Sequence, residues 1–289
     1  MTAPIAHFNG KLLPLDQISI SQLDRGFIFG DGVYEVIPVY AGVALRAREH
    51  FERLQRSMDE IQLKNPHSVD EWIRLADELL AHHPGNQAVY IQVTRGAPEK
   101  RDHVIPKDLK PTVFMMSNPL ASPSKEAIEN GVRCVTSDDF RWAKCHIKST
   151  SLLGNVLARQ ISADAGATET ILLRDGFLTE ASASNVFVVK NGVVAAPPRD
   201  HLILLGITYD LLVKLAAEGA LKLEIRPITE AELRAADEVW LTSSTKEVLA
   251  VTTLDGTPVG SGKPGPAFKR MHALYQEYKA SLKKARAAA

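Results

Sequence analysis

The segment at residues 118–126 most constrains how this chain of 289 residues can fold. Its sequence, NPLASPSKE, combines two prolines with short polar residues, a composition typical of a linker. On both sides of it, strand-like runs rich in β-branched and aromatic residues alternate with runs whose apolar residues recur at helical spacing. We therefore expect an α+β (mixed α/β) protein with a small α/β domain over 1–118, a linker over 119–125 and a larger domain over 126–289.

The first domain is predicted to contain a hairpin followed by two helices. A Tyr40-Ala41-Gly42 turn separates two strand-like runs, and Pro38 in the first run indicates an edge or a bulge because proline cannot donate to a strand ladder. Apolar residues recur at helical spacing from 48 to 61, which predicts a helix there. Ser68 and Glu71 then match the capping box that opens a second helix.

The second domain is predicted to contain a helix at about 151–165 and several short strands. Four residues of that helix are expected on one side, namely Leu153, Val156, Leu157 and Gln160. Strands are expected near TILLR, SNVFVVK, VVAA and DEVWLT, and a further helix is expected from Gly206.

Composition narrows the class of partner. The chain has 34 basic and 34 acidic residues, so it lacks the basic footprint of a nucleic-acid binder. We expect a small neutral or zwitterionic partner, and neither nucleic acid nor membrane. No run approaches the roughly 20 apolar residues that cross a bilayer, which favours a cytoplasmic protein. Cys134 and Cys145 lack metal-ligand spacing, so we expect buried free thiols and no metal.

Lys148 is the first candidate for chemistry. It follows an apolar run and precedes a hydroxyl-rich segment, where partial burial would favour the neutral amine that forms a Schiff base. The alternative is a lysine whose ammonium group simply reaches solvent.

Two further segments could bind an anion or another ligand. LGIT at 205–208 begins an amphipathic helix, where backbone N–H groups and the Thr208 hydroxyl could converge on a phosphate. An ordinary helix start is the alternative. TSST at 242–245 follows a strand and presents short hydroxyls at its end, although a polar turn would have the same sequence.

Five blocks of sequence, taken in order, resemble the signatures of the class IV, fold type IV aminotransferases. They are RGFIFGDGVYE at 25–35, REHFERL at 48–54, KSTSLLGN at 148–155, TEASASNVF at 179–187 and LGIT at 205–208. Within that class, the D-amino acid aminotransferases are the most similar. The resemblance runs through nearly the whole chain. It implies a pyridoxal 5′-phosphate enzyme of two domains, with the cofactor at the interface of the small N-terminal and larger C-terminal domains.

The resemblance also implies roles for individual residues. Lys148 would hold the cofactor as an aldimine and then shuttle a proton, and Glu180 would keep the pyridine nitrogen protonated. The other residues that it assigns to cofactor binding are Arg53, Leu204, Gly206, Ile207, Thr208, Ser243, Ser244 and Thr245.

Substrate choice is implied by Arg101 and His103, which resemble the carboxylate trap of the D-amino acid enzymes. There the two side chains reach across a homodimer interface and join Tyr34 around the substrate α-carboxylate. Binding of the α-carboxylate by these residues determines which face of the α-carbon presents its hydrogen to Lys148. The implied reaction is a ping-pong transfer from a D-amino acid, such as D-alanine or D-glutamate, to a 2-oxo acid, such as 2-oxoglutarate or pyruvate.

Three other activities fit parts of the same pattern. A branched-chain L-amino acid aminotransferase or an aminodeoxychorismate lyase would use the same scaffold and the same lysine. A cofactor-binding protein without catalysis would retain the Lys148 chemistry but accept no amino donor.

Overall fold

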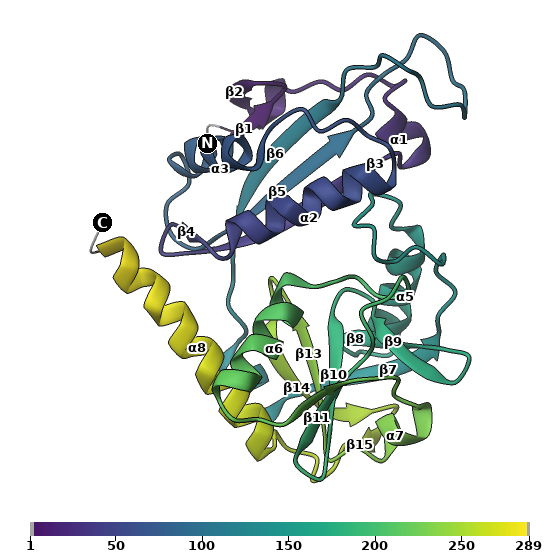
Figure 1. Ribbon diagram of the computed structural model, residues 1–289, viewed down its shortest axis with the longest axis vertical. Coiled ribbons are helices and arrows are strands. Elements are labelled where there is room, and N and C mark those ends of the chain that lie inside the picture. Colours follow the sequence, from purple (N-terminus) through teal and green to yellow (C-terminus); the bar gives the residue numbers. More distant parts are fainter. Residues whose placement is uncertain (1–2, 288–289) are drawn as a thin grey trace. The chain divides into compact units, whose positions relative to one another are not determined.

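The computed structural model describes residues 3–287, and these form two compact units (Figure 1). The first unit consists of Met1–Ala121 together with Ile147–Leu152, and the second of Ser122–His146 together with Leu153–Ala289. Helices and strands occur in both units, as predicted for an α+β protein. The predicted linker at 119–125 stays a prediction. The short segment Ile147–Leu152, which the sequence analysis placed in the second domain, packs with the first unit.

The first unit is built on a six-stranded antiparallel sheet of order β2-β1-β6-β5-β3-β4. Its elements are β1 (Ile5–Phe8), β2 (Lys11–Pro14), the 3₁₀ helix η1 (Leu15–Gln17), α1 (Arg25–Phe29), β3 (Gly32–Tyr40), β4 (Val43–Ala44), α2 (Ala47–Glu60), α3 (Val69–Leu80), β5 (Gln87–Thr94) and β6 (Thr112–Pro119).

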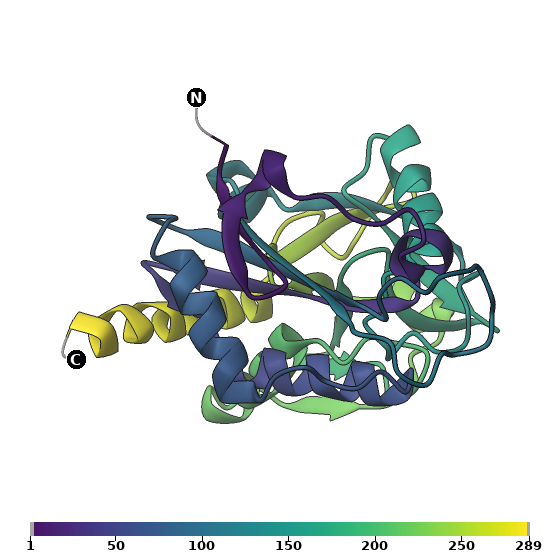
Figure 2. The ribbon, with the colours of Figure 1, turned by 90° about the horizontal axis from the view of Figure 1, so that it is seen from above.

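Helices α2 and α3 pack on one side of the sheet and cover the hydrophobic core of this unit (Figure 2). Phe51 and Leu54 of α2 and Trp72 of α3 are fully buried in one cluster with alternate residues of β5. That alternation follows from the strand repeat of two residues, which turns successive side chains to opposite faces. The predicted capping box is confirmed in part, because the Ser68 hydroxyl accepts a hydrogen bond of 3.2 Å from the Glu71 N–H.

The predicted hairpin is confirmed as β3 and β4. Ala41 and Gly42 both have positive φ, 51° and 75°, which is the conformation that a tight two-residue hairpin turn requires. Pro38 pairs with Ala88 without a register shift, and β4 pairs only with Val39 and Tyr40. Pro38 therefore lies next to the short edge strand β4 and not in a bulge, and its carbonyl accepts a hydrogen bond from the Leu45 N–H at 2.8 Å.

The second unit is built on a nine-stranded mixed sheet of order β12-β11-β10-β13-β14-β7-β8-β9, with β15 pairing with β14. Its elements are α4 (Lys125–Asn130), β7 (Val132–Asp138), α5 (Leu153–Asp164), β8 (Glu169–Arg174), β9 (Phe177–Ala181), β10 (Asn185–Lys190), β11 (Val193–Ala196), α6 (Ile207–Glu218), β12 (Leu223–Ile225), α7 (Glu230–Arg234), β13 (Glu238–Ser243), β14 (Glu247–Leu254), β15 (Thr257–Pro258) and α8 (Pro266–Ala287).

The central strands of this sheet are buried on both faces. In β10, Val186 and Val188 belong to one hydrophobic cluster, whereas Phe187 and Val189 belong to another that includes residues of α6 and α8. Continuous apolar runs are typical of strands that are covered on both sides. This explains why SNVFVVK and DEVWLT lack polar alternation.

Helix α5 forms where the sequence predicts a helix, but the predicted face is not buried against the unit. Leu153, Val156 and Leu157 are 72%, 59% and 51% exposed, and the helix buries Ala158 and Ser162 instead. Helical periodicity shows which residues share a face but does not identify what covers that face. Within residues 3–287, no helix combines the length and the apolar character needed to cross a membrane.

The two cysteines are free and buried, as predicted, and this makes their reactivity testable. Burial raises the pKa of Cys134 to about 12 and that of Cys145 to about 11. Because the thiolate is the nucleophile, we expect a disulfide reagent such as dithiobis-nitrobenzoate to label the native protein very slowly at pH 8. The same reagent should titrate both thiols at once in denaturant, which serves as the control. Rapid labelling of the native protein would contradict this placement.

Candidate functional site

Arg53 lies buried on α2 in a charged cluster of the first unit. Its Nε donates to Oε1 of Glu35 at 2.7 Å and its Nη2 donates to Oε2 at 2.8 Å. His50 Nδ1 lies 2.8 Å from the same Oε2, and all three side chains are at most 5% exposed. Burial alone would raise the pKa of Glu35, but Arg53 and His50 outweigh it and hold that pKa well below its usual range. Glu35 is therefore a permanent carboxylate.

His50 is the neutral member of this cluster. Burial lowers its pKa, although Glu35 acts in the opposite direction, and the positive charges of Arg53 and Lys148 lower it further. A neutral ring donates one N–H, and the nearby carboxylate assigns that proton to Nδ1. The sequence analysis missed both Glu35 and His50. Their available signal was the helical spacing of His50 and Arg53, which places the two on one face of a helix.

Lys148 lies beside Tyr34 in the first unit. The N–H of Tyr34 donates to the Lys148 carbonyl at 2.9 Å, and the N–H of Lys148 donates to the Ser57 hydroxyl at 3.2 Å. The Lys148 Nζ is 4.2 Å from the centre of the Tyr34 ring, within the range of a cation–π contact. Val33 and Ser149 form an isolated bridge, so this segment is attached to β3 as a short extra strand would be.

Arg101 and His103 are exposed in the loop between β5 and β6 and flank Phe29 of α1. The guanidinium carbon of Arg101 is 4.8 Å from the centre of the Phe29 ring, and the His103 ring centre is 5.0 Å from it. Arg25 holds the loop by donating to the carbonyls of Asp102 at 2.5 Å and of His103 at 3.3 Å. Within residues 3–287 of one chain, no hydrogen bond or ring contact joins Arg101 or His103 to Tyr34.

Glu180 lies buried on β9 in the second unit, surrounded by donors. Its Oε1 accepts from Arg141 Nη1 at 2.5 Å, and its Oε2 accepts from the Leu204 N–H at 3.0 Å and from Asn185 Nδ2 at 3.1 Å. Burial raises the pKa of Glu180 to about 7, although Arg141 and the Leu204 N–H act in the opposite direction. Arg141 was missed by the sequence analysis, since no pattern in the sequence relates it to Glu180.

Gly206 begins α6 next to this carboxylate. A side chain there would place its Cβ 2.1 Å from Asn185 Oδ1, so only glycine fits. Helix α6 has no side-chain cap, and Ile207 and Thr208 form its buried first turn. An uncapped helix N-terminus presents unpaired N–H groups and the positive end of the helix dipole, a suitable site for a phosphate.

The turn at 243–245 joins β13 to β14 at the same end of the sheet. Thr242 pairs with Asn185 in the β10–β13 register, which places the turn close to the ligands of Glu180. The Ser243 hydroxyl accepts from the Lys246 N–H at 3.2 Å, as expected of a polar turn. Buried Glu169 anchors the turn, because its carboxylate binds Lys246 Nζ at 2.7 Å and also the Ala183 N–H at 2.8 Å.

Apart from Arg101 and His103, which lie beside Phe29, the predicted site residues form two groups. In the first unit, the Lys148 side chain lies against the Tyr34 ring. The Lys148 N–H donates to Ser57 of α2, the helix that also carries Arg53. In the second unit, one end of the sheet gathers Glu180, Leu204, Gly206, Ile207, Thr208, Ser243, Ser244 and Thr245. The pyridoxal phosphate predicted from the sequence suits the second group, since an ionisable carboxylate lies next to an uncapped helix start.

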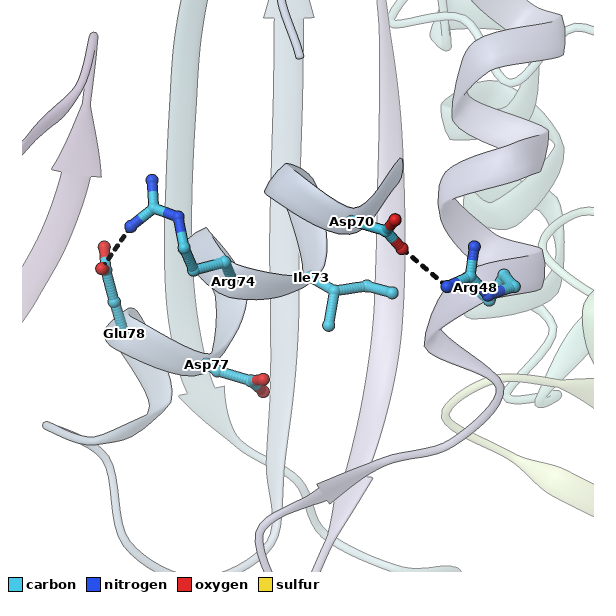
Figure 3. A pocket seen from close by; sticks show the side chains of 6 residues that line it. All are labelled: Arg48, Asp70, Ile73, Arg74, Asp77 and Glu78. Atoms are coloured by element: carbon cyan, nitrogen blue, oxygen red, sulfur yellow. Dashed lines mark hydrogen bonds and ion pairs between the residues drawn. The ribbon is translucent and has the colours of Figure 1, made fainter. Parts of the chain in front are cut away.

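A pocket of about 600 Å³ on α2 and α3 contains none of the predicted residues (Figure 3). Figure 3 shows that its arginines are paired with acids of the same rim, Arg48 with Asp70 at 2.6 Å and Arg74 with Glu78. It is lined by Arg48, Asp70, Ile73, Arg74, Asp77 and Glu78. We assign it no ligand.

The Glu35–Arg53 pair predicts a large loss of stability when one partner is removed. Glu35→Gln leaves a buried guanidinium without its counter-charge, so the free energy of unfolding should fall by about 3–5 kcal/mol. Glu49→Gln, which breaks an Arg46–Glu49 pair that is 40% exposed on the glutamate side, should cost less than about 1 kcal/mol and serves as the control. Urea denaturation followed by circular dichroism measures both, and equal effects would contradict the assignment.

The raised pKa of Glu180 predicts a pH-dependent stability in the cofactor-free protein. Its folded pKa of about 7 exceeds the ordinary value of 4.5, so its contribution is fully present below pH 4.5 and is lost as pH rises through 7. Wild type should therefore lose stability relative to Glu180→Gln between pH 5 and pH 8, by about 1.4 kcal/mol for each unit of pKa difference. Glu126→Gln, at an exposed carboxylate of α4, is the control. A pH-independent difference for Glu180→Gln would refute the raised pKa.

Comparison with known proteins identifies the family. The family model described as Amino-transferase class IV matches residues 32–254. The D-alanine aminotransferase of Bacillus licheniformis is 42% identical over 271 residues, which cover 93% of this chain and 95% of that protein. The D-alanine aminotransferase of Staphylococcus aureus strain MW2 is 39% identical over 272 residues, covering 93% of this chain and 96% of that protein.

Solved structures agree with this result. The branched-chain amino acid aminotransferase of T.th., solved with pyridoxamine 5′-phosphate, has a TM-score of 0.90 at 25% identity and covers 98% of this chain and 96% of that one. The Escherichia coli branched-chain amino acid aminotransferase has a TM-score of 0.88 at 26% identity, covering 93% of this chain and 92% of that one. The resemblance predicted from the sequence is confirmed, and the chain belongs to the class IV aminotransferases.

Proposed function

We propose that this chain is a pyridoxal 5′-phosphate-dependent D-amino acid aminotransferase. It would move the amino group of a D-amino acid, of the D-alanine or D-glutamate type, to a 2-oxo acid such as 2-oxoglutarate or pyruvate. The relatives named D-alanine aminotransferase, at up to 42% identity, support the substrate class. The geometric observation that carries the proposal is the group around Glu180, in which a buried carboxylate and an uncapped helix start share one end of a sheet.

The residues present fit the cofactor. The first-turn N–H groups of Ile207 and Thr208 would bind its phosphate, with Ser243, Ser244 and Thr245 supplying hydroxyls and Leu204 supporting the ring. Arg53 is proposed as a further phosphate ligand, and its pair with Glu35 fixes the plane of its guanidinium. When bound, pyridoxal phosphate supplies an electron sink that allows the bond between the α-carbon and its hydrogen to break.

The side chains of this protein would then perform three tasks. Lys148 Nζ takes the proton from the substrate α-carbon and later returns one, a role that its contact with the Tyr34 ring helps to orient. Glu180, as a carboxylate, accepts a hydrogen bond from the protonated ring nitrogen and stabilises its positive charge. Arg101 and His103 bind the substrate α-carboxylate together with Tyr34, which fixes the face of the α-carbon that meets Lys148.

We also propose that the active form is a homodimer in which the partner subunit supplies Arg101 and His103. Both side chains are exposed in one chain, and neither forms a hydrogen bond or ring contact with Tyr34 there. Helix α5 and the segment before it expose several large apolar side chains, which is typical of a surface that another protein covers. These are Phe140, Trp142, Leu153, Val156 and Leu157.

The test is a visible spectrum of the protein with pyridoxal phosphate, recorded while amino donors are added. With D-alanine and 2-oxoglutarate, we expect the cofactor band to change and pyruvate and glutamate to form. Lys148→Ala should lower the rate at least about 100-fold, since it removes the general base. Arg101→Ala should mainly raise KM for the amino acid, because it removes a carboxylate ligand and leaves the base in place.

Other outcomes of this test would identify the alternatives. Turnover of L-leucine alone would favour a branched-chain aminotransferase and overturn the role of Arg101 and His103. Release of pyruvate from aminodeoxychorismate without a 2-oxo acid would favour the lyase. A cofactor band that no amino donor changes would favour a binding protein without catalysis, and the absence of any band would overturn the cofactor itself.

A further inference from the structure

Arg141 lies between two buried carboxylates in the second unit. Its Nε and Nη2 donate to the two oxygens of Asp139 at 2.9 Å each, and its Nη1 donates to Oε1 of Glu180 at 2.5 Å. The three side chains are 3%, 0% and 7% exposed. The planar guanidinium is therefore fixed by a fork on one side and directs its remaining edge at Glu180.

The surroundings keep Asp139 and Arg141 charged. Burial would raise the pKa of Asp139, but hydrogen bonds from Arg141 and Thr179 and the charge of Arg141 hold it below its usual value. Burial would lower the pKa of Arg141, and the two carboxylates raise it. Arg174 is a second cation beside Asp139, with its Nη2 3.3 Å from Oδ1 of that carboxylate. In the described part of the chain, Arg174 forms no hydrogen bond or ion pair with Glu180. With Glu180 ionised, two cations balance two anions.

Glu180 receives donors and meets no acceptor among the described residues. Oε2 accepts two hydrogen bonds, from Leu204 and Asn185, whereas Oε1 accepts one, from Arg141. An ionised carboxylate offers about four acceptor sites, two on each oxygen. The acceptor site that is left belongs to Oε1, the oxygen whose position Arg141 fixes.

We propose that Arg141 is the positioning residue that favours the ionised form of Glu180 and directs the remaining acceptor site of Oε1 toward the N–H of the bound pyridine ring. This inference rests on the proposed function, since it concerns the residue that would contact the ring nitrogen. In this arrangement Arg141 acts through Glu180, to which its Nη1 donates.

The physical need for Arg141 follows from burial. The pKa of Glu180 is raised to about 7 even with the Arg141 guanidinium in contact. Removal of that guanidinium would therefore leave the Glu180 carboxyl protonated at neutral pH. A protonated Glu180 has no negative charge to balance a pyridinium ring, and its O–H would instead donate to an unprotonated ring nitrogen. The ring nitrogen would then lose its proton and the ring would accept electrons less well.

The experiment is an infrared titration of the cofactor-free protein from pH 5 to pH 10. The band of the protonated Glu180 carboxyl is assigned by its loss in Glu180→Gln. We expect Arg141→Met to move the midpoint of this titration upward by at least about one pH unit, a tenfold change in proton affinity. Arg174→Met is the matched control, since it removes a cation that binds Asp139 but not Glu180, and its midpoint should stay close to that of wild type.

A second measurement separates charge control from a structural role. The dissociation constant of pyridoxal phosphate should rise about tenfold in Arg141→Met at pH 7, and the deficit should narrow at high pH as Glu180 ionises. A structural defect would weaken binding equally at every pH. If Arg141→Met does not fold, Arg141→Lys replaces it. A lysine keeps the positive charge but lacks the planar fork that pairs with Asp139 while donating to Glu180, so a smaller upward shift of the Glu180 midpoint is expected.

An unmoved midpoint in Arg141→Met, or in Arg141→Lys where that variant replaces it, or an equal shift in Arg174→Met, would overturn the proposal. The titration uses neither cofactor nor substrate, so it distinguishes this failure from failure of the proposed function. A protein that does not transaminate D-alanine but shows the shifted midpoint would retain the Arg141–Glu180 relationship and lose only the reaction assigned to it.

Discussion

Buried carboxylates must be compensated inside each unit, and the positions of many other residues follow from this requirement. Glu35 is compensated by Arg53, Glu180 by Arg141 and Glu169 by Lys246, and each of the three carboxylates is at most 7% exposed. Breaking such a pair costs several kcal/mol because the remaining charge is left without a partner. Each pair also joins two separate segments of its unit.

The second unit shows how one such carboxylate organises a site. Glu180 binds the Leu204 N–H and Asn185, Asn185 also donates to the Leu204 carbonyl at 2.8 Å, and its Oδ1 occupies the space that a side chain at Gly206 would need. The start of α6 is therefore set by the carboxylate on β9. The requirement for glycine at position 206 is a consequence of this packing and not of backbone strain, because φ there is −66°.

The sequence alone predicted local structure well and pairings poorly. The hairpin at Ala41, the helix over 48–61 and the Ser68 cap follow from local rules, and all three are present. Arg141 and Glu180 are 39 residues apart, and their contact depends on how strands are ordered in a sheet. The exposed face of α5 was beyond prediction for a related reason, since periodicity describes a helix and not its partner. The cofactor residues came from the family resemblance.

Glu35 and Glu180 are both buried, but they differ in the number of hydrogen bonds that each accepts from an arginine. This difference separates a structural role for Glu35 from a chemical role for Glu180. Arg53 gives two N–H donors to Glu35, which also receives His50, so the pKa of Glu35 falls well below its usual range. Arg141 shares its donors with Asp139 and gives one to Glu180, so burial prevails and the pKa of Glu180 rises to about 7. A carboxyl poised near neutrality responds to the charge of whatever binds beside it, whereas Glu35 stays ionised at every physiological pH.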